Sequence, residues 1–255
     1  MRHCEPHVIL GERTGQLMFL TPVQTAPQSS FRMTRAVIFD VDGTLIDSND
    51  LHTQCWLETF RHFGLNFAYD QVRSQIGKGG DQLLPTLLPS AVLEQQQQAI
   101  SDYRDDLFKR NYLSRVKPFP AVKALFERVR SEGAVIVLAS SGLQVEVDQH
   151  VEMLGIGDLI TAATTSDDAE SSKPEPDIFQ AALQRLPGDA RSDVWVVGDS
   201  PFDAQAAGKA GLRTIGLLCG GFSEPVLRGA GCVAIFQSPQ HLLANYDASP
   251  LNANA

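Results

Sequence analysis

Residues 36–45 read AVIFDVDGTL: four apolar residues run into two carboxylates spaced two apart, and a glycine follows shortly after. A continuous apolar run that contains Val and Ile and is bounded by Gly is typical of a buried parallel strand. Asp is depleted in strands and costly to bury, so Asp40 and Asp42 at the end of this strand require a cation or a reaction. Ligands of open α/β sheets bind outside the carboxyl ends of the strands, where these two residues are expected. The stretch therefore predicts a metal-assisted, phosphate-handling site with Asp40 as its nucleophile.

The composition is that of an ordinary globular protein, with 43% hydrophobic and 20% charged residues among 255. That length suffices for one large α/β domain, or for a domain that carries an insertion. The formal net charge of −9 argues against nucleic acid and against an anionic membrane surface as partners. The four cysteines form no CxxC pair, which favours reduced thiols in a cytoplasm. No apolar run approaches the ~20 residues that span a bilayer. We therefore expect a soluble, cytoplasmic monomer or small homo-oligomer.

Both ends of the chain differ from the middle. Residues 1–34 contain three prolines and a broken apolar pattern, and their apolar runs are too short for a signal peptide. They predict a flexible or loosely docked extension, and Met33 is an alternative start of the chain. Residues 247–255 are polar and predict a disordered tail.

The middle of the chain changes its periodicity twice. Residues 49–117 show helical periodicity and no strand-like run, which predicts an all-helical insertion. Residues 35–48 and 118–246 instead alternate apolar strands with amphipathic helices. This alternation predicts an α/β core with a doubly wound parallel sheet and helices on both of its faces.

Residues that carry chemistry recur where the predicted strands end. Asp40 and Asp42 follow the first strand, Ser140 the second and Asp199 a later one, while Lys173 precedes a helix. The carboxyl ends of parallel strands share one edge of the sheet, so these side chains are expected to converge. Carboxylate oxygens suit Mg²⁺. A phosphoryl group on that metal also needs a hydrogen-bond donor and a second positive charge, which a serine and a lysine supply.

With these residues the chain resembles the haloacid dehalogenase superfamily, and the four motifs of that superfamily occur in order. They are Asp40-Val41-Asp42-Gly43-Thr44, Ser140, Lys173 and Gly198-Asp199-Ser200-Pro201-Phe202-Asp203. The resemblance covers about residues 35–245. It implies a Rossmann-like core, in which the helical insertion over 49–117 is the helical cap domain of that family.

The resemblance implies a phosphatase that works in two steps with Mg²⁺. Asp40 is expected to attack phosphorus and form an aspartyl-phosphate, while Asp42 protonates the leaving oxygen and later deprotonates water. Mg²⁺ is expected on the Asp40 carboxylate, the Asp42 backbone carbonyl and Asp199. Asp203 is either a further ligand or a group that orients the others.

The same resemblance assigns the contacts to the phosphate. Ser140 is expected to hold a phosphate oxygen, and Lys173 to neutralise charge on the nucleophile and on the transferring group. Thr44, in the first motif, and Ser141, beside the second, are further candidates for substrate binding.

The helical insertion is expected to select the substrate, a small phosphorylated metabolite. His52 occupies the place where members resembling β-phosphoglucomutase carry a histidine. Lys78, in the loop Gly77–Gly80, either binds an anionic substrate group or is a solvated charge. The mutase-like members place an arginine near this loop, where this chain has Gly79 and Gly80. This difference favours a phosphatase over a sugar phosphomutase.

Two more distant alternatives are a dehalogenase and a catalytically silent binding protein on the same fold. Dehalogenases attack carbon and have no use for a general acid two residues after the nucleophile, so Asp42 argues against the first. The complete set of motif residues argues against the second.

Overall fold

The computed structural model describes residues 36–252, apart from the side chain of residue 189. The predicted extension over 1–34 and the end of the predicted tail, 253–255, lie outside the described residues.

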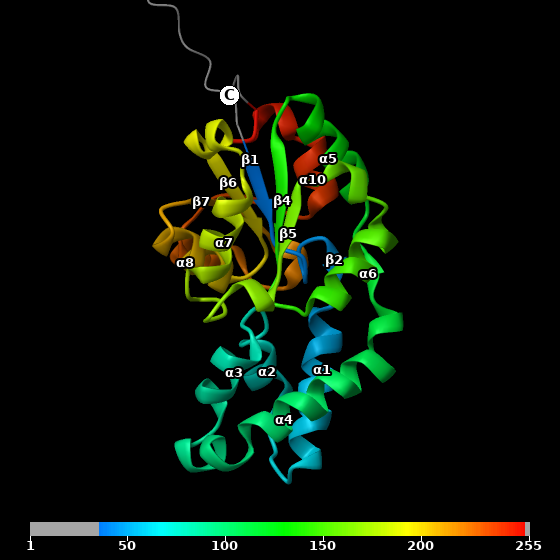
Figure 1. Ribbon diagram of the computed structural model, residues 1–255, viewed down its shortest axis with the longest axis vertical. Coiled ribbons are helices and arrows are strands. Elements are labelled where there is room, and N and C mark those ends of the chain that lie inside the picture. The colour runs from blue at the N-terminus through cyan, green and yellow to red at the C-terminus, as the bar shows by residue number, and fades with distance from the viewer. Residues whose placement is uncertain (1–35, 253–255) are drawn as a thin grey trace, which may run out of the picture. The chain divides into compact units, whose positions relative to one another are not determined.

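Six parallel strands form the central sheet in the order β5-β4-β1-β6-β7-β8 (Figure 1). They are β1 (Ala36–Phe39), β4 (Val135–Ala139), β5 (Ala162–Thr164), β6 (Val194–Gly198), β7 (Arg213–Leu217) and β8 (Cys232–Phe236). Strand β1 pairs in parallel with β4 on one side and with β6 on the other. The chain leaves β1 toward β4 and β5, then returns to β6 and continues the opposite way. This reversal beside β1 confirms the doubly wound prediction and marks the carboxyl end of β1 as the expected ligand site.

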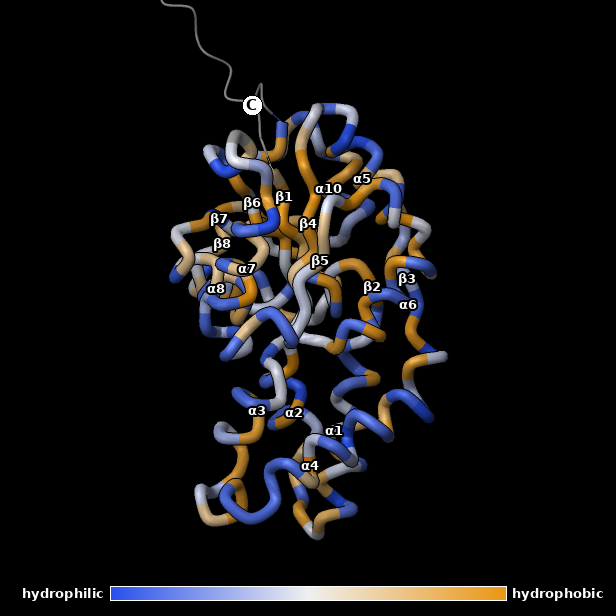
Figure 2. The backbone as a smooth tube through the Cα atoms, in the orientation of Figure 1, coloured by the Kyte–Doolittle hydropathy of each residue, from blue (hydrophilic) through white to orange (hydrophobic). Residues whose placement is uncertain are grey.

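The two faces of β1 belong to two separate hydrophobic layers. Val37 and Phe39 pack into one layer, where the Phe39 ring lies 4.6 Å from that of Phe126. Ala36 and Ile38 pack into the other layer. All four residues are fully buried, which explains the uninterrupted apolar run in the sequence. Figure 2 shows the same concentration of hydrophobic residues along β1 and β4.

Helices cover both faces of the sheet. The first hydrophobic layer includes residues of α5 (Val122–Ser131), α6 (Gln144–Leu154) and α10 (Pro239–Ala244). The second layer includes residues of α7 (Asp177–Arg185) and α8 (Pro201–Lys209). Helix α9 (Glu224–Ala230) packs near β8. Short 3₁₀ turns occur at Leu113–Arg115, Gly157–Leu159, Ser166–Asp168, Gly188–Ser192, Leu218–Gly220 and Tyr246–Ala248.

Four helices make up the helical segment, residues 49–111, which lies beyond the carboxyl end of β1 (Figure 1). They are α1 (Asn49–His62), α2 (Tyr69–Arg73), α3 (Gly80–Leu87) and α4 (Ser90–Asn111). The segment has a hydrophobic cluster of its own that includes Trp56, Phe60 and Ile100. Two short antiparallel strands, β2 (Ile46–Asp47) and β3 (Lys117–Pro118), join it to the sheet. Among the described residues, no helix is both long and apolar enough to cross a membrane.

The prediction of a disordered tail is wrong for residues 247–252. Tyr246–Ala248 forms a 3₁₀ turn, and Leu251 is fully buried in the first hydrophobic layer. The Ser249 hydroxyl donates to the Tyr246 carbonyl at 2.7 Å, and Arg128 pairs with Asp247 at 2.7 Å. A single leucine after polar residues gives no periodic signal, yet it buries enough apolar surface to dock the segment.

Candidate active site

The turn after β1 places Asp40 and Asp42 at the carboxyl end of the sheet. The Leu45 amide donates to the Val41 carbonyl at 2.8 Å, and Gly43 has a φ of +77°. A Cβ atom at Gly43 would lie only 2.2 Å from Asn49 Nδ2 and 2.5 Å from the Asp199 carboxylate. Glycine is therefore required at this position both by the backbone conformation and by the available space.

Three buried carboxylates meet at this turn. Oxygen atoms of Asp40, Asp199 and Asp203 lie within 4.8 Å of one another, and each residue is at most 5% exposed. Asp199 follows β6, and Asp203 lies in the first turn of α8. The Thr44 hydroxyl lies 2.8 Å from Asp40 Oδ2 and 3.0 Å from Asp199 Oδ1. Since a hydroxyl has a single hydrogen, Thr44 donates to one of them at a time and holds the two carboxylates side by side.

Lys173 is the cation of this cluster. Its ammonium donates to Asp40 Oδ1 and, at 3.3 Å, to the Ala139 carbonyl, and it lies 2.7 Å from Asp203 Oδ1. The second oxygen of Asp203 accepts from the amide and the hydroxyl of Ser200, at 3.0 and 2.6 Å. Ser200 thus holds one oxygen of Asp203, while Oδ1 faces the Lys173 ammonium without a hydrogen bond. This arrangement lets Asp203 orient Lys173 and cap α8, and its Oδ1 also belongs to the carboxylate group that could hold a metal.

The cluster carries more negative charge than Lys173 balances. Burial, followed by repulsion from Asp203, raises the pKa of Asp40 to about 7, although Lys173 acts in the opposite direction. Burial and repulsion from Asp40 and Asp203 raise the pKa of Asp199 well above its usual range. Crowded carboxylates of this kind are stabilised by a cation. Their hard oxygen donors match the preference of Mg²⁺, so the residues present fit that metal.

Asp42 has different neighbours. Its Oδ1 accepts from the Ser48 hydroxyl at 2.6 Å and lies 2.9 Å from His52 Nε2. Arg104 lies 2.7 Å from His52 Nδ1, and because a guanidinium only donates, Nδ1 must accept and Nε2 must carry the hydrogen. Burial acts to raise the pKa of Asp42, but the hydrogen bonds from His52 and Ser48 outweigh burial and hold this pKa below its usual range.

The two serines predicted to contact phosphate lie just after the end of β4. Ser140 is buried, and its hydroxyl accepts from the Gly142 amide at 3.0 Å. The Ser141 hydroxyl is buried without a hydrogen-bond partner among the described residues, and Ser141 lines the cavity described next. The hydrogen-bonding capacity of the Ser141 hydroxyl is thus not used by the described residues.

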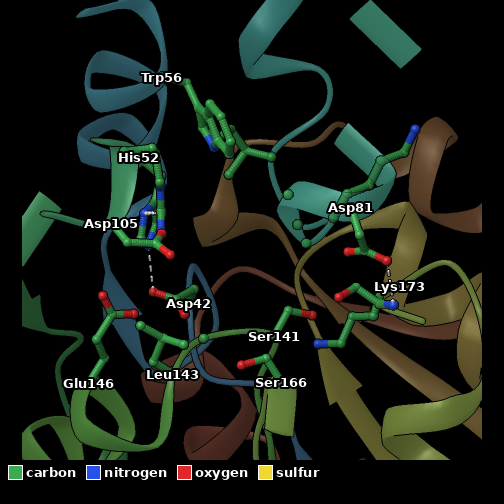
Figure 3. Close-up of a pocket in the computed structure, with 18 of the residues that line it drawn as sticks. Asp42, His52, Trp56, Asp81, Asp105, Ser141, Leu143, Glu146, Ser166 and Lys173 are labelled. Carbon is green, nitrogen blue, oxygen red and sulfur yellow. Dashed lines mark hydrogen bonds and ion pairs between the residues drawn. The ribbon is translucent and has the colours of Figure 1, made fainter. Parts of the chain in front are cut away.

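A cavity of about 280 Å³ lies between the helical segment and the sheet (Figure 3). Asp40, Asp42 and Lys173 line it from the sheet side, and His52 and Trp56 line it from the helical segment. Asp40, Asp42 and Lys173 therefore share one cavity although they come from distant parts of the chain, whereas Ser140 and Asp199 do not line it.

Two of the predicted substrate contacts are placed differently from the others. Lys78 lines the cavity, but its ammonium donates to Gln75 and Thr86 of the helical segment, at 2.8 and 2.9 Å. The Thr44 hydroxyl lies between Asp40 and Asp199, and it is therefore placed to orient carboxylates.

Three residues of this site were missed by the sequence analysis. Ser48 and Asn49 belong to a run of typical N-cap residues, but Ser48 makes no side-chain capping bond and donates to Asp42 instead. The Asn49 amide donates to Asp199 Oδ2 at 2.9 Å and to the Gly220 carbonyl at 3.0 Å. Arg104 lies 52 residues from His52 along the chain, so only the packing of α4 against α1 could reveal it.

The chain is similar to proteins of known families over most of its length. The model of the haloacid dehalogenase-like hydrolase family matches residues 37–217. A phosphoglycolate phosphatase from Yersinia pseudotuberculosis is 33% identical over 195 residues, which cover 74% of this chain and 83% of that protein. The chloroplastic protein SUPPRESSOR OF QUENCHING 1 from Arabidopsis thaliana is 29% identical over 218 residues, and the match spans only 20% of its length.

A solved structure has the same architecture. The crystal structure of a hydrolase from Pseudomonas syringae superimposes with a TM-score of 0.76 at 27% identity, covering 84% of this chain and 98% of that one. The family match, this fold and the carboxylates at the end of β1 agree with one another. The chain belongs to the haloacid dehalogenase-like hydrolase family, and it is therefore a hydrolytic enzyme.

Proposed function

We propose that the chain is a Mg²⁺-dependent phosphatase that hydrolyses a small phosphomonoester through an aspartyl-phosphate on Asp40. The observation that carries this proposal is the pair of carboxylates in the cavity. Lys173 and Thr44 hold Asp40, while Asp42 uses only Oδ1 for Ser48 and His52. Among the described residues, Asp42 Oδ2 has no hydrogen-bond partner, so it remains available for proton transfer.

Mg²⁺ would be held by the carboxylates of Asp40 and Asp199 and by the backbone carbonyl of Asp42. When bound, it supplies positive charge for the carboxylates and for the phosphoryl group. Asp203 is assigned the orienting role, because Ser200 holds one of its oxygens and the Lys173 ammonium lies 2.7 Å from the other.

In the first step, the Asp40 carboxylate attacks phosphorus and the ester bond to the alcohol breaks. The negative charge of the incoming phosphate raises the pKa of Asp42 and so favours its protonated form. Protonated Asp42 then gives its proton to the leaving oxygen. Lys173 and the hydroxyls of Ser140 and Ser141 stabilise the charge on the phosphoryl oxygens. In the second step, Asp42 removes a proton from water as the water attacks phosphorus, which releases inorganic phosphate and restores Asp40.

The helical segment supports the proposal in two ways. His52 donates to Asp42 and fixes its orientation, and Trp56 closes the cavity opposite the sheet. A sugar phosphomutase would need a second phosphate site here. Gly79 and Gly80 offer no cation, and the Lys78 ammonium donates to Gln75 and Thr86 within the helical segment, so hydrolysis is the better assignment.

We also propose that the substrate is a small phosphorylated metabolite of the cytoplasm. The free, largely buried thiols of Cys55, Cys219 and Cys232 support a reducing compartment.

The test is release of inorganic phosphate from 4-nitrophenyl phosphate by the purified protein. Release is expected to require Mg²⁺ and to fall by at least ~10³-fold in Asp40→Asn, as is typical when a nucleophile is removed. Asp47→Asn, which changes an exposed carboxylate in β2, is the matched control and should retain activity. Retention of activity in Asp40→Asn, or equal release in excess EDTA, would contradict the proposal.

A further inference from the structure

Glu146 is a buried carboxylate in the cavity for which the proposed reaction has no use. It lies in the first turn of α6, is 5% exposed and lines the cavity. Among the described residues it accepts no side-chain hydrogen bond and forms no ion pair. A charged group is costly to bury without a partner, so this carboxylate points to a ligand that supplies one.

Other polar groups in the same cavity are also without partners. The hydroxyls of Ser141 and Ser166 and Nε of Arg104 are buried and make no hydrogen bond within the described part of the chain. These groups and Glu146 come from α4, α6 and two separate loops. Buried polar atoms are almost always satisfied in native proteins, so several orphans around one cavity indicate a polar ligand.

Glu146 lies near the carboxylate that serves the leaving group. A Cβ atom placed on Gly142 would be 3.2 Å from Glu146 Oε2 and 4.0 Å from Asp42 Oδ2, so both oxygens face the same glycine. Figure 3 shows Glu146, Asp42 and His52 on one side of the cavity and Lys173 on the other. An alcohol that leaves toward Asp42 therefore extends past Glu146.

The guanidinium of Arg104 also lines the cavity. It attracts Glu146, but its terminal nitrogens are used by Asp105 at 2.9 Å and by His52 at 2.7 Å. Only Nε lacks a partner. Arg104, Asp105 and Glu146 together carry one positive and two negative formal charges, so this end is negative.

This combination suits a neutral hydroxyl group. A hydroxyl can donate to the Glu146 carboxylate, which has no hydrogen-bond donor among the described side chains. A carboxylate on the leaving alcohol would meet net negative charge, and the engaged nitrogens of Arg104 would not offer it their usual two-pronged contact.

We propose that Glu146 is a specificity-determining residue that accepts a hydrogen bond from a hydroxyl of the leaving alcohol. The site then favours phosphate esters of polyols over phosphate esters of hydroxy acids. This inference rests on the proposed phosphatase activity and names the substrate class of the same site.

The test compares two esters that differ at one carbon. Glycerol 3-phosphate ends in a hydroxymethyl group where 3-phosphoglycerate has a carboxylate, and 4-nitrophenyl phosphate has neither. The wild type should prefer the first over the second in kcat/KM. In Glu146→Leu, kcat/KM for glycerol 3-phosphate should fall by about tenfold or more, mainly through KM, because a hydrogen bond to a charged group is lost.

The replacement Glu146→Leu should change kcat/KM differently for each of the three substrates. For 4-nitrophenyl phosphate, kcat/KM should stay within about twofold of the wild-type value. For 3-phosphoglycerate, kcat/KM should rise because the Glu146 carboxylate no longer repels the substrate carboxylate. Glu146→Gln, which keeps an acceptor, should lose less with glycerol 3-phosphate than Glu146→Leu. Glu152→Gln, an exposed change on the same helix, is the matched control and should leave all three values unchanged.

Three results would overturn the inference: a wild-type preference for 3-phosphoglycerate, an equal fall with all three esters, or an unchanged ratio between the first two. Calorimetric binding of glycerol 3-phosphate to Asp40→Asn, with and without Glu146→Leu, tests it without turnover. Equal affinities there would also overturn it. Absence of phosphate release from every ester would instead contradict the phosphatase proposal, while the binding difference still decides the role of Glu146.

Discussion

Asp42 illustrates how one carboxylate depends on residues that are far apart in the chain. Ser48, just before α1, and His52, within α1, both contact Oδ1, and Arg104 of α4 contacts the far side of the His52 ring. That ring is also stacked on Phe108, at 4.2 Å between centroids. The orientation of Asp42 is therefore set by the helical segment, whereas Asp40 is held by residues of the core.

The two aspartates are expected to respond differently to metal. Asp42→Asn should slow phosphate release by about 10²-fold or more, because the proton-transfer group is lost. Its affinity for Mg²⁺ should change little, because the proposed ligand is the backbone carbonyl, which the substitution keeps. Asp199→Asn should weaken Mg²⁺ binding strongly, since a charged oxygen ligand is removed.

Isothermal titration of Mg²⁺ into each variant measures the difference directly. An equal loss of affinity in Asp42→Asn and Asp199→Asn would show that the Asp42 side chain itself binds the metal. Asp47→Asn again serves as the control for a change of charge at the surface.

The loop after β7 connects the helical segment to the carboxylate cluster. The Gly220 carbonyl accepts from Asn49 at the start of α1 and from Arg73 at the end of α2. The backbone of Gly220 packs so closely that a Cβ atom there would lie 1.7 Å from Asp199 Oδ2. Gly221 has a φ of +91°, and a Cβ atom there would lie 2.4 Å from the guanidinium of Arg73. Side chains at these two positions would displace either a proposed metal ligand or a contact of the helical segment.

Gly220→Ala is therefore expected to damage the site as well as the fold. The methyl group must push Asp199 aside, so both Mg²⁺ affinity and kcat/KM should fall, with a loss of stability of about 1–3 kcal/mol from overpacking. Gly229→Ala in α9 is the matched control, because no atom lies within 4 Å of its Cβ position. That change should leave activity unaltered and stabilise the protein by about 0.4–1 kcal/mol.

Urea denaturation and Mg²⁺ titration of both variants provide the measurement. If Gly220→Ala loses stability but keeps the wild-type affinity for Mg²⁺, then Asp199 is not held by this packing.

The sequence predicted elements well where periodicity or burial was continuous. The run AVIF became the fully buried strand β1, and the helical periodicity predicted over residues 49–117 corresponds to helices α1 to α4. Strands β2 and β3 contain two residues each, and α10 contains six. These three elements are too short to give a detectable periodicity in the sequence. The same contrast holds in the site: strand ends placed Asp40 and Asp199, but Arg104 and Glu146 depend on how helices pack, which periodicity does not show.

At the scale of the whole molecule, the buried carboxylates of the site lower the stability of the fold. The chain buries Asp40, Asp199 and Asp203 around one lysine, at a position where apolar residues would be more stable. Sites whose local arrangement conflicts with folding are the expected places of function. A bound cation relieves this conflict, so metal binding and stability are linked.

This conflict predicts that, without metal, Asp40→Asn stabilises the protein at neutral and alkaline pH. Burial and repulsion from Asp203 raise the pKa of Asp40 from 3.8 to about 7 in the folded protein. Between these values the folded state keeps a proton that the unfolded chain releases, so the free energy of unfolding falls as the pH rises. Below pH 3.8 Asp40 is protonated in both states and does not lower the free energy of unfolding. The full loss of stability is reached once the pH passes 7 and the folded protein has also lost this proton. Asparagine does not titrate, so the variant escapes this loss.

Urea denaturation in EDTA at pH 5, 6, 7 and 8 provides the measurement. The stability of Asp40→Asn relative to wild type should increase with pH over this range and level off above 7. At ~1.4 kcal/mol per pKa unit, the total gain is on the order of a few kcal/mol. Saturating Mg²⁺ should reverse the order, because the wild-type carboxylate binds the cation and asparagine does not. A difference that is independent of pH would mean that Asp40 is ionised in the metal-free fold, and the repulsion among the three carboxylates would then not be the reason for metal binding.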